Sequence, residues 1–180
     1  MKKFLIIVFI ALIAALFTAA APQEPVRTAK QTALHEAAEI LRAAGYKDTD
    51  APIVALSDEW NRQQADLDII AKVIDNEAPY CPWDHRVAVA AVVLNRVADP
   101  RFPASVREVV VQPGQYLPSY TVGFERVRRS SYEAAVAAMD GEHSVPPDVV
   151  WQANFPQGRE TWWISEVNTG SFRSTTWFCR

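Results

Sequence analysis

Residues 69–77 read Ile-Ile-Ala-Lys-Val-Ile-Asp-Asn-Glu, and the fold expected for this chain is organised around them. At helical spacing, one face carries three aliphatic side chains and then an acid, at Ile70, Val73, Ile74 and Glu77. Burying an ionised carboxylate costs several kcal/mol unless it is paired, so an acid on such a face is usually protonated or in an ion pair. A carboxylic acid that stays protonated near neutral pH is what general acid catalysis needs. The pattern therefore makes Glu77 a candidate catalytic acid.

A purely structural interpretation of Glu77 is also open. Pro79 and Pro82 follow closely and are expected to end the helix. Glu77 would then lie in the last turn, where the apolar face already turns towards solvent. Helical spacing alone does not choose between the two interpretations.

The sequence from Glu77 onward contains several unusual short strings in a fixed order. They are Glu-Ala at 77–78, a Val-Ala-Val-Ala helix ending Leu-Asn-Arg at 94–96, Arg-Phe-Pro at 101–103 and Pro-Gly-Gln-Tyr at 113–116. In this order they resemble the cell-wall hydrolase family of the spore cortex-lytic (SleB) type, closely over 66–120 and more loosely to the C-terminus. The resemblance implies a lysozyme-like fold and cleavage of peptidoglycan glycan strands between N-acetylmuramic acid and N-acetylglucosamine, with Glu77 as the catalytic acid.

The chain departs from the family pattern directly after the Glu-Ala pair. Many relatives have Arg-Gly-Glu there, whereas this chain has Pro-Tyr-Cys at 79–81, so the family's nearby second acid is absent. Glycosidases usually need a second carboxylate. Asp84 and Asp75 are candidates, but Asp84 is placed to cap the next helix and Asp75 points off the Glu77 face.

A site with one carboxylate suits lytic transglycosylation. Glu77 would protonate the bridging oxygen and then accept a proton from the muramic acid 6-hydroxyl as that hydroxyl closes on C1. The departure at 79–81 also keeps open a function of another class, a non-catalytic wall-binding or assembly protein on the same fold.

The substrate groove is expected to be aromatic, because the C–H faces of sugars stack on rings. Trp83 and Tyr116 flank the motif in predicted loops, so we expect them to bind substrate, whereas the other tryptophans are expected in the core. By resemblance, Gln115 belongs to the site, where its amide suits a sugar acetamido group. Gln152 and Asn154, on a predicted strand, are candidates for the opposite wall.

Other chemistries fit the sequence poorly. The three histidines lie in separate predicted elements, and neither a zinc-binding motif nor a serine-nucleophile elbow is present. Cys81 and His85 stand four residues apart, but Pro82 separates them and an exported thiol is more often oxidised than catalytic. We therefore expect no metal and no cofactor.

The N-terminus predicts export. Two lysines, an uncharged apolar stretch over 4–17 and small residues up to Ala20 are typical of a signal peptide at 1–20. An uncleaved anchor is the alternative, because 4–21 lies at the short end of a spanning helix. Either way, we expect a secreted or extracytoplasmic, cell-wall-associated protein that touches a membrane only through this segment.

The charge balance limits the partners. Losing the two N-terminal lysines leaves 16 basic against 21 acidic residues. An acidic chain is a poor nucleic-acid binder, since that binding depends on neutralising phosphates. The net negative charge also argues against simple attraction to an anionic wall polymer, so recognition of glycan is expected to come from a shaped groove. We also expect a monomer.

The 180 residues allow a single core. We expect a linker and N-terminal helix over 21–56, the helix at 30–44 with Gly45 just beyond its end, and a catalytic domain over 57–180. The helix leading to Glu77 is expected to start at a Ser57 cap and to break near Gln64.

The rest of the catalytic domain is expected to be mostly helical. Further helices are predicted at 85–97, apolar on every side and so central, at 105–111 and from Ser130, with a capping box to Glu133. Short β-rich stretches at 149–155, 160–164 and 175–179 predict a small antiparallel sheet near the C-terminus. The fold class is therefore α+β.

The two cysteines, Cys81 and Cys179, predict one disulfide. An exported chain with two cysteines has a single possible intramolecular pairing. The bond would pin the last strand against the loop that follows Glu77. Two separately buried thiols are the alternative.

Overall fold

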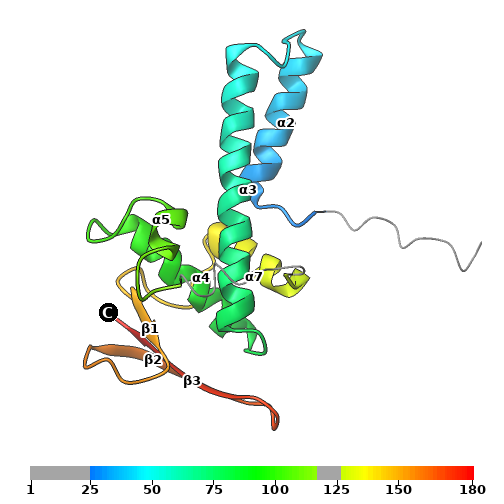
Figure 1. The fold of residues 1–180 in the computed structure, drawn as a ribbon. Helices are drawn as coiled ribbons and strands as arrows, with labels where there is room; N and C mark the ends of the chain where they lie inside the picture. Colours follow the sequence, from blue (N-terminus) through cyan, green and yellow to red (C-terminus); the bar gives the residue numbers. More distant parts are fainter. Residues whose placement is uncertain (1–24, 117–126) are drawn as a thin grey trace, which may run out of the picture.

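The computed structural model describes residues 25–116 and 127–180, and the predicted signal peptide lies outside these ranges. Helices make up the first part of the described chain and a three-stranded antiparallel sheet makes up its end (Figure 1). The α+β class, mostly helical with a small sheet near the C-terminus, is confirmed.

Helix α2, Ala29–Ala43, packs along α3, Ala51–Glu77, as a helical hairpin (Figure 1). Thr28 caps α2 in a capping box with Gln31, whose side chain accepts a hydrogen bond from the Thr28 N–H at 3.0 Å. Gly45 follows the C-cap with φ of 92°, a conformation that favours glycine. The helix predicted at 30–44 is therefore confirmed to within a residue.

Helix α3 is continuous, so the predicted start at Ser57 and the break near Gln64 are wrong. The helix begins earlier because Pro52 stands in its first turn, where a missing N–H costs nothing. Gln64 stays helical, and its side chain donates to Asp68 at 3.0 Å. The predicted domain boundary between 56 and 57 consequently falls inside α3. Within the described ranges, no helix has both the length and the apolar character needed to cross a membrane.

Helix α4, Trp83–Ala98, is the centre of the core. Every residue from Val87 to Val93 is buried, as the all-apolar sequence predicted. The helix contacts α3, α7, Arg129–Met139, and the short helix α5, Val106–Val110. Its N-cap is Pro82, and Asp84 lies within the first turn without capping it, so the predicted Asp84 cap is wrong.

The predicted capping of the two later helices has mixed outcomes. Ser105 caps α5 by accepting from the Glu108 N–H at 3.3 Å, as predicted. The predicted box between Ser130 and Glu133 is wrong, because α7 begins one residue earlier and its N-cap, Arg128, supplies no side-chain acceptor. A residue from α3 provides that acceptor instead.

Asp75 of α3 receives the hydrogen bonds at the start of α7. Its Oδ1 accepts from the Arg128 N–H at 3.1 Å, from the Arg128 guanidinium at 3.1 Å and from the Ser131 hydroxyl at 2.7 Å. A carboxylate at a helix N-terminus pairs with unsatisfied N–H groups and with the positive end of the dipole. Asp75 therefore joins α3 to α7.

We expect Asp75→Ala to lower the free energy of unfolding by about 1–2 kcal/mol, the typical loss for an N-terminal cap. Urea unfolding followed by circular dichroism measures this change. Asp58→Ala, at an exposed aspartate on the same helix, is the matched control and should leave stability within error. Equal stabilities for the two variants would contradict the capping role.

The sheet contains β1, Trp151–Ala153, β2, Thr161–Asn168, and β3, Arg173–Cys179, in the order β1-β3-β2. Both pairings are antiparallel. Trp163 pairs with Phe178 across β2 and β3, and their rings stack at 5.2 Å against the helical core. Figure 1 shows the sheet at the C-terminal end of α3, where Glu77 lies.

The predicted Cys81–Cys179 disulfide is wrong, because both cysteines are free thiols. Cys81 belongs to the same core cluster as Phe178. Neighbouring side chains on a strand point to opposite faces, so Cys179 points away from the face that Phe178 presents to this core. On its own face, the Cys179 Sγ lies 3.8 Å from the Thr161 Oγ1.

Candidate active site

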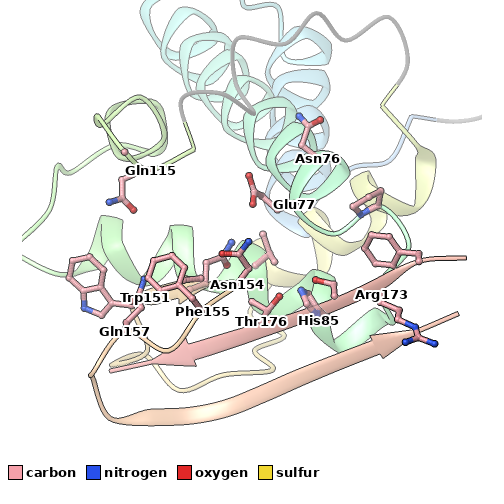
Figure 2. A pocket seen from close by; sticks show the side chains of 17 residues that line it. Asn76, Glu77, His85, Gln115, Trp151, Asn154, Phe155, Gln157, Arg173 and Thr176 are labelled. Carbon is pink, nitrogen blue, oxygen red and sulfur yellow. The ribbon is translucent and has the colours of Figure 1, made fainter. Parts of the chain in front are cut away.

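A cavity of about 490 Å³ lies between the end of α3, the loop at 114–115 and the sheet (Figure 2). It contains four of the residues predicted for the site, namely Glu77, Gln115, Gln152 and Asn154. These residues come from three separate parts of the chain. Their placement in one cavity agrees with the predicted site, while the role of each residue stays a prediction.

Glu77 is the last residue of α3 and is exposed, so the expectation of a buried acid is wrong and the structural alternative is right about its position. The apolar face ends at Ile74, whose carbonyl accepts the Ala78 N–H at 2.9 Å as the helix terminates. The carboxyl of Glu77 points from the helix end towards the cavity (Figure 2). Exposure at the cavity mouth makes this carboxyl accessible to a ligand.

Glu77 is the single carboxylate among the described residues that line the cavity. Asp84 borders a different hollow, together with Glu142 and His143. Asp75 is engaged at the start of α7, off the Glu77 face, as expected. Neither candidate for a second acid is therefore brought to the cavity.

The two predicted substrate-binding aromatics do not line the cavity. Trp83 lies in the first turn of α4, and its indole N–H donates to Glu142 at 2.7 Å. Tyr116 turns inward and is only 4% exposed; burial raises the pKa of its hydroxyl to about 12. The loop positions inferred from sequence gave no information on the direction of these side chains.

The sequence prediction missed the rings that do line the cavity, because it expected every tryptophan except Trp83 in the core and named no phenylalanine for the site. They are Trp151, Phe155 and Phe172. Phe155 is 58% exposed, whereas the Trp151 ring has the Arg159 guanidinium over it at 3.8 Å. Phe155 stands just before Pro156, and this loop position was the signal that could have identified it.

Several buried polar atoms of the cavity lining have no hydrogen-bond partner among the described residues. They are the side-chain oxygens of Gln152 and Gln157 and the indole nitrogen of Trp151. Buried polar groups are normally paired, so unpaired ones at a cavity indicate a place for a ligand or water. Two acceptors and one donor suit a ligand with both N–H or O–H groups and oxygen acceptors. Asn154, just beyond β1, adds an exposed amide to the same wall.

Helix α4 holds this wall in place through two polar residues at its end. The Asn95 side chain donates to the carbonyls of Pro146 and Val149 at 2.8 and 2.9 Å. The Arg96 Nε donates to the Val150 carbonyl at 2.6 Å. Asn95 and Arg96 thus bond backbone carbonyls, and the backbone that they bond leads directly into β1.

His85 and Cys81 do not form a nucleophilic pair. The His85 Nδ1 lies 2.7 Å from the Ser165 hydroxyl, and burial lowers the pKa of this imidazole to about 4. Burial also raises the pKa of the Cys81 thiol. A thiol that stays protonated is a poor nucleophile, so cysteine catalysis is disfavoured. Among the described residues, no three His, Cys, Asp or Glu side chains are grouped as a metal site would require.

An acid at the mouth of a cavity lined by rings and amides is typical of proteins that bind or cleave glycans. The family model described as Cell Wall Hydrolase matches residues 82–178, which is more than half of the chain. The chain therefore belongs to this family, and the family predicted from the sequence is confirmed. The match begins after Glu77, so the role of that residue does not follow from it.

Individual relatives agree with this assignment. The spore cortex-lytic enzyme of Bacillus subtilis (strain 168) is 42% identical over 48 residues, which are 27% of this chain and 16% of that protein. The chain thus matches a minor part of that relative's length.

Two solved structures are similar to this chain. The catalytic domain of the germination-specific lytic transglycosylase SleB from Bacillus anthracis is 22% identical, with a TM-score of 0.49 over 65% of this chain and 95% of that one. The catalytic domain of the Bacillus cereus SleB protein is 23% identical, with a TM-score of 0.48 over 65% and 91%.

Proposed function

We propose that this protein is a monomeric lytic transglycosylase that acts outside the cytoplasm. It would cleave peptidoglycan glycan strands between N-acetylmuramic acid and N-acetylglucosamine, with Glu77 as general acid and then base. Family membership supports the cell wall as the substrate. One observation carries the mechanism, namely that Glu77 is the single carboxylate among the described residues of the cavity.

A single carboxylate is sufficient for this reaction. Glu77 donates its proton to the bridging oxygen, and the bond from that oxygen to C1 of the muramic acid breaks. The 6-hydroxyl of the same sugar then attacks C1, and Glu77 takes back the proton that the hydroxyl loses. No water is consumed, so no second carboxylate is needed to activate water or to form a covalent intermediate.

The cavity offers contacts that would place a glycan against Glu77. Phe155 presents an exposed ring for a sugar face, and the amides of Gln115, Gln152 and Asn154 offer hydrogen bonds. A glycan filling the cavity would exclude water from the Glu77 carboxyl, which disfavours the charged form. We propose no stacking role for Trp83 or Tyr116.

We expect the new glycan ends to carry 1,6-anhydromuramic acid, one water molecule lighter than hydrolytic ends. Purified peptidoglycan would be digested with the protein, reduced with borohydride and analysed by mass spectrometry. Borohydride reduces hydrolytic ends and leaves anhydro ends unchanged, so the two products separate in mass. Products with only reducible ends would contradict the one-carboxylate mechanism.

The same digestion tests the second candidate, a non-catalytic wall-binding protein, which the Pro-Tyr-Cys segment after Glu77-Ala78 favours. Zymography on gels containing purified wall shows whether lysis occurs at all. Sedimentation of the protein with wall but no zone of lysis would favour the binding function over the enzyme.

A further inference from the structure

Arg96 is a buried cation beside the cavity with mostly neutral surroundings. It is 1% exposed, and no ion pair between described residues includes it. Its guanidinium carbon lies 5.3 Å from the ring centres of Phe102 and Trp151 and 5.4 Å from that of Tyr116. Rings and oxygen atoms of neutral groups thus surround the charge, and these contacts fix its position.

Arg96 also contacts the cavity residue Gln115. Its Nη1 donates to the Gln115 Oε1 at 2.6 Å, while its Nε donates to the Val150 carbonyl. Val150 directly precedes Trp151 in the chain. One side chain therefore holds both the loop of Gln115 and the start of β1, which form two walls of the cavity (Figure 2).

The contact with Arg96 determines which end of the Gln115 amide is available to a ligand. A guanidinium has five donors and no acceptor, so the atom that faces it at 2.6 Å has to be the amide oxygen. A glutamine amide has nearly the same shape in both orientations, and without Arg96 either end would suit the site. With Arg96 in place, the two amide N–H groups face away from the guanidinium, and Gln115 lines the cavity.

We propose that Arg96 is a positioning residue that makes Gln115 a hydrogen-bond donor to an acetamido carbonyl of the bound glycan. The inference rests on the proposed function for its substrate class. A hydroxyl can donate or accept and would not require a fixed amide, whereas a carbonyl oxygen can only accept. A donor of fixed orientation therefore selects the carbonyl, which is present in N-acetylated sugars and missing in N-deacetylated ones.

Gln115→Glu tests the proposal with little risk to the fold. The glutamate keeps an oxygen for Arg96 and adds an opposite charge, but it has no N–H to offer the ligand. Binding would be measured in full-length protein that also carries Glu77→Gln, so that cleavage does not interfere. The probes are peptide-free glycan strands, either fully N-acetylated or chemically N-deacetylated, and affinities come from calorimetry.

We expect Gln115→Glu to lower the affinity for N-acetylated strands about tenfold or more, since a donor is lost and a carboxylate meets a carbonyl. The preference should also invert, because the new carboxylate attracts the ammonium groups of deacetylated strands. Asn61→Asp, the same amide-to-acid change at an exposed site 16 residues before Glu77 on α3, should change neither affinity. Unchanged affinity for N-acetylated strands in a folded Gln115→Glu protein would overturn the proposal.

Arg96→Lys provides the second test. Lysine keeps the charge but lacks the planar guanidinium, whose separate N–H groups donate to Gln115 and to Val150 at the same time. The preference for N-acetylated strands should fall while the unfolding temperature of the variant stays within a few degrees. A folded Arg96→Lys protein with the full preference would contradict the positioning role, and Gln115→Glu decides alone if this variant does not fold.

The proposed function can fail independently of this inference. Anhydro products come from the wild-type digestion, whereas the preference for N-acetylated strands comes from binding to a protein that cannot cleave. Inverted preference without wild-type cleavage would leave the donor assignment standing and remove the enzyme mechanism. Wild-type cleavage together with unchanged glycan binding by Gln115→Glu would leave the enzyme mechanism standing and overturn the donor assignment.

Discussion

Glu77→Gln is expected to reduce release of muropeptides from purified peptidoglycan by about 10²- to 10⁴-fold, the range that a positioned general acid contributes. The amide keeps the size and shape of the side chain but has no acidic proton for the bridging oxygen. In the one-carboxylate mechanism it also cannot accept the proton of the 6-hydroxyl, so both steps are lost. Release is measured by chromatography of the soluble products over time.

The fold should tolerate this change, because Glu77 is exposed at the end of α3 and glutamine keeps the size and shape of its side chain. The unfolding temperature of Glu77→Gln should therefore equal that of the wild type. Asp84→Asn is the matched control, since it removes a nearby acid that borders a separate hollow. Loss of activity in Asp84→Asn, or full activity in Glu77→Gln, would contradict the assignment of Glu77 as the single acid.

Helical periodicity predicted the element that carries Glu77 but not the surroundings of that residue. Ile70, Val73 and Ile74 are fully buried, as their spacing predicted. The same spacing placed Glu77 with them, but the helix ends at Glu77 and its side chain is exposed. Periodicity describes the direction of a side chain, whereas burial depends on what packs against that face, and tertiary structure decides this.

Three of the capping predictions failed for a related reason. Ser57, Ser130 and Asp84 have the side chains that cap helices, and each stands near a predicted helix start. In the structure α7 receives its acceptor from Asp75, which precedes it by more than fifty residues. A capping motif is read from a few neighbouring residues, so it cannot reveal a capping residue from a distant helix.

The amides of the site were predicted better than its aromatic rings. Gln115 came from the family resemblance, and Gln152 from its place on a short strand, and both line the cavity. Trp83 and Tyr116 were chosen because they flank the motif, yet one side chain bonds Glu142 and the other packs on Arg96. Proximity in sequence identified the right loops without giving the direction of the rings.

The second large effect concerns stability in acid and depends on His85. Its imidazole is 1% exposed and packs edge-on against the rings of Phe178 and Trp163, with centroids at 5.4 and 6.2 Å. Burial lowers its pKa from 6.5 to about 4, and no charged neighbour contributes to the shift. The folded protein therefore keeps this histidine neutral at pH values where the unfolded chain protonates it.

The direction of the pH effect follows from proton uptake. Between pH 6.5 and about 4, the unfolded state binds one more proton at this site than the folded state, so the free energy of unfolding falls as the pH falls. Above pH 6.5 the free energy of unfolding is not reduced by protonation of His85. Acidification to pH 4 lowers the free energy of unfolding by about 3 kcal/mol through this residue. Asp99, whose pKa is lowered to about 2 by its hydrogen bond from Arg101, acts below this window.

We expect His85→Gln to remove this part of the pH dependence. Glutamine can still bond the Ser165 hydroxyl but does not titrate, so its urea midpoint should change less between pH 7.5 and 4.5 than that of the wild type. Subtracting the two profiles isolates His85 from other titrating groups, such as Asp66, whose pKa is raised by burial. His143→Gln, at an exposed histidine, should keep the wild-type profile. If His85→Gln lost as much stability in acid as the wild type, the buried imidazole would not be the cause.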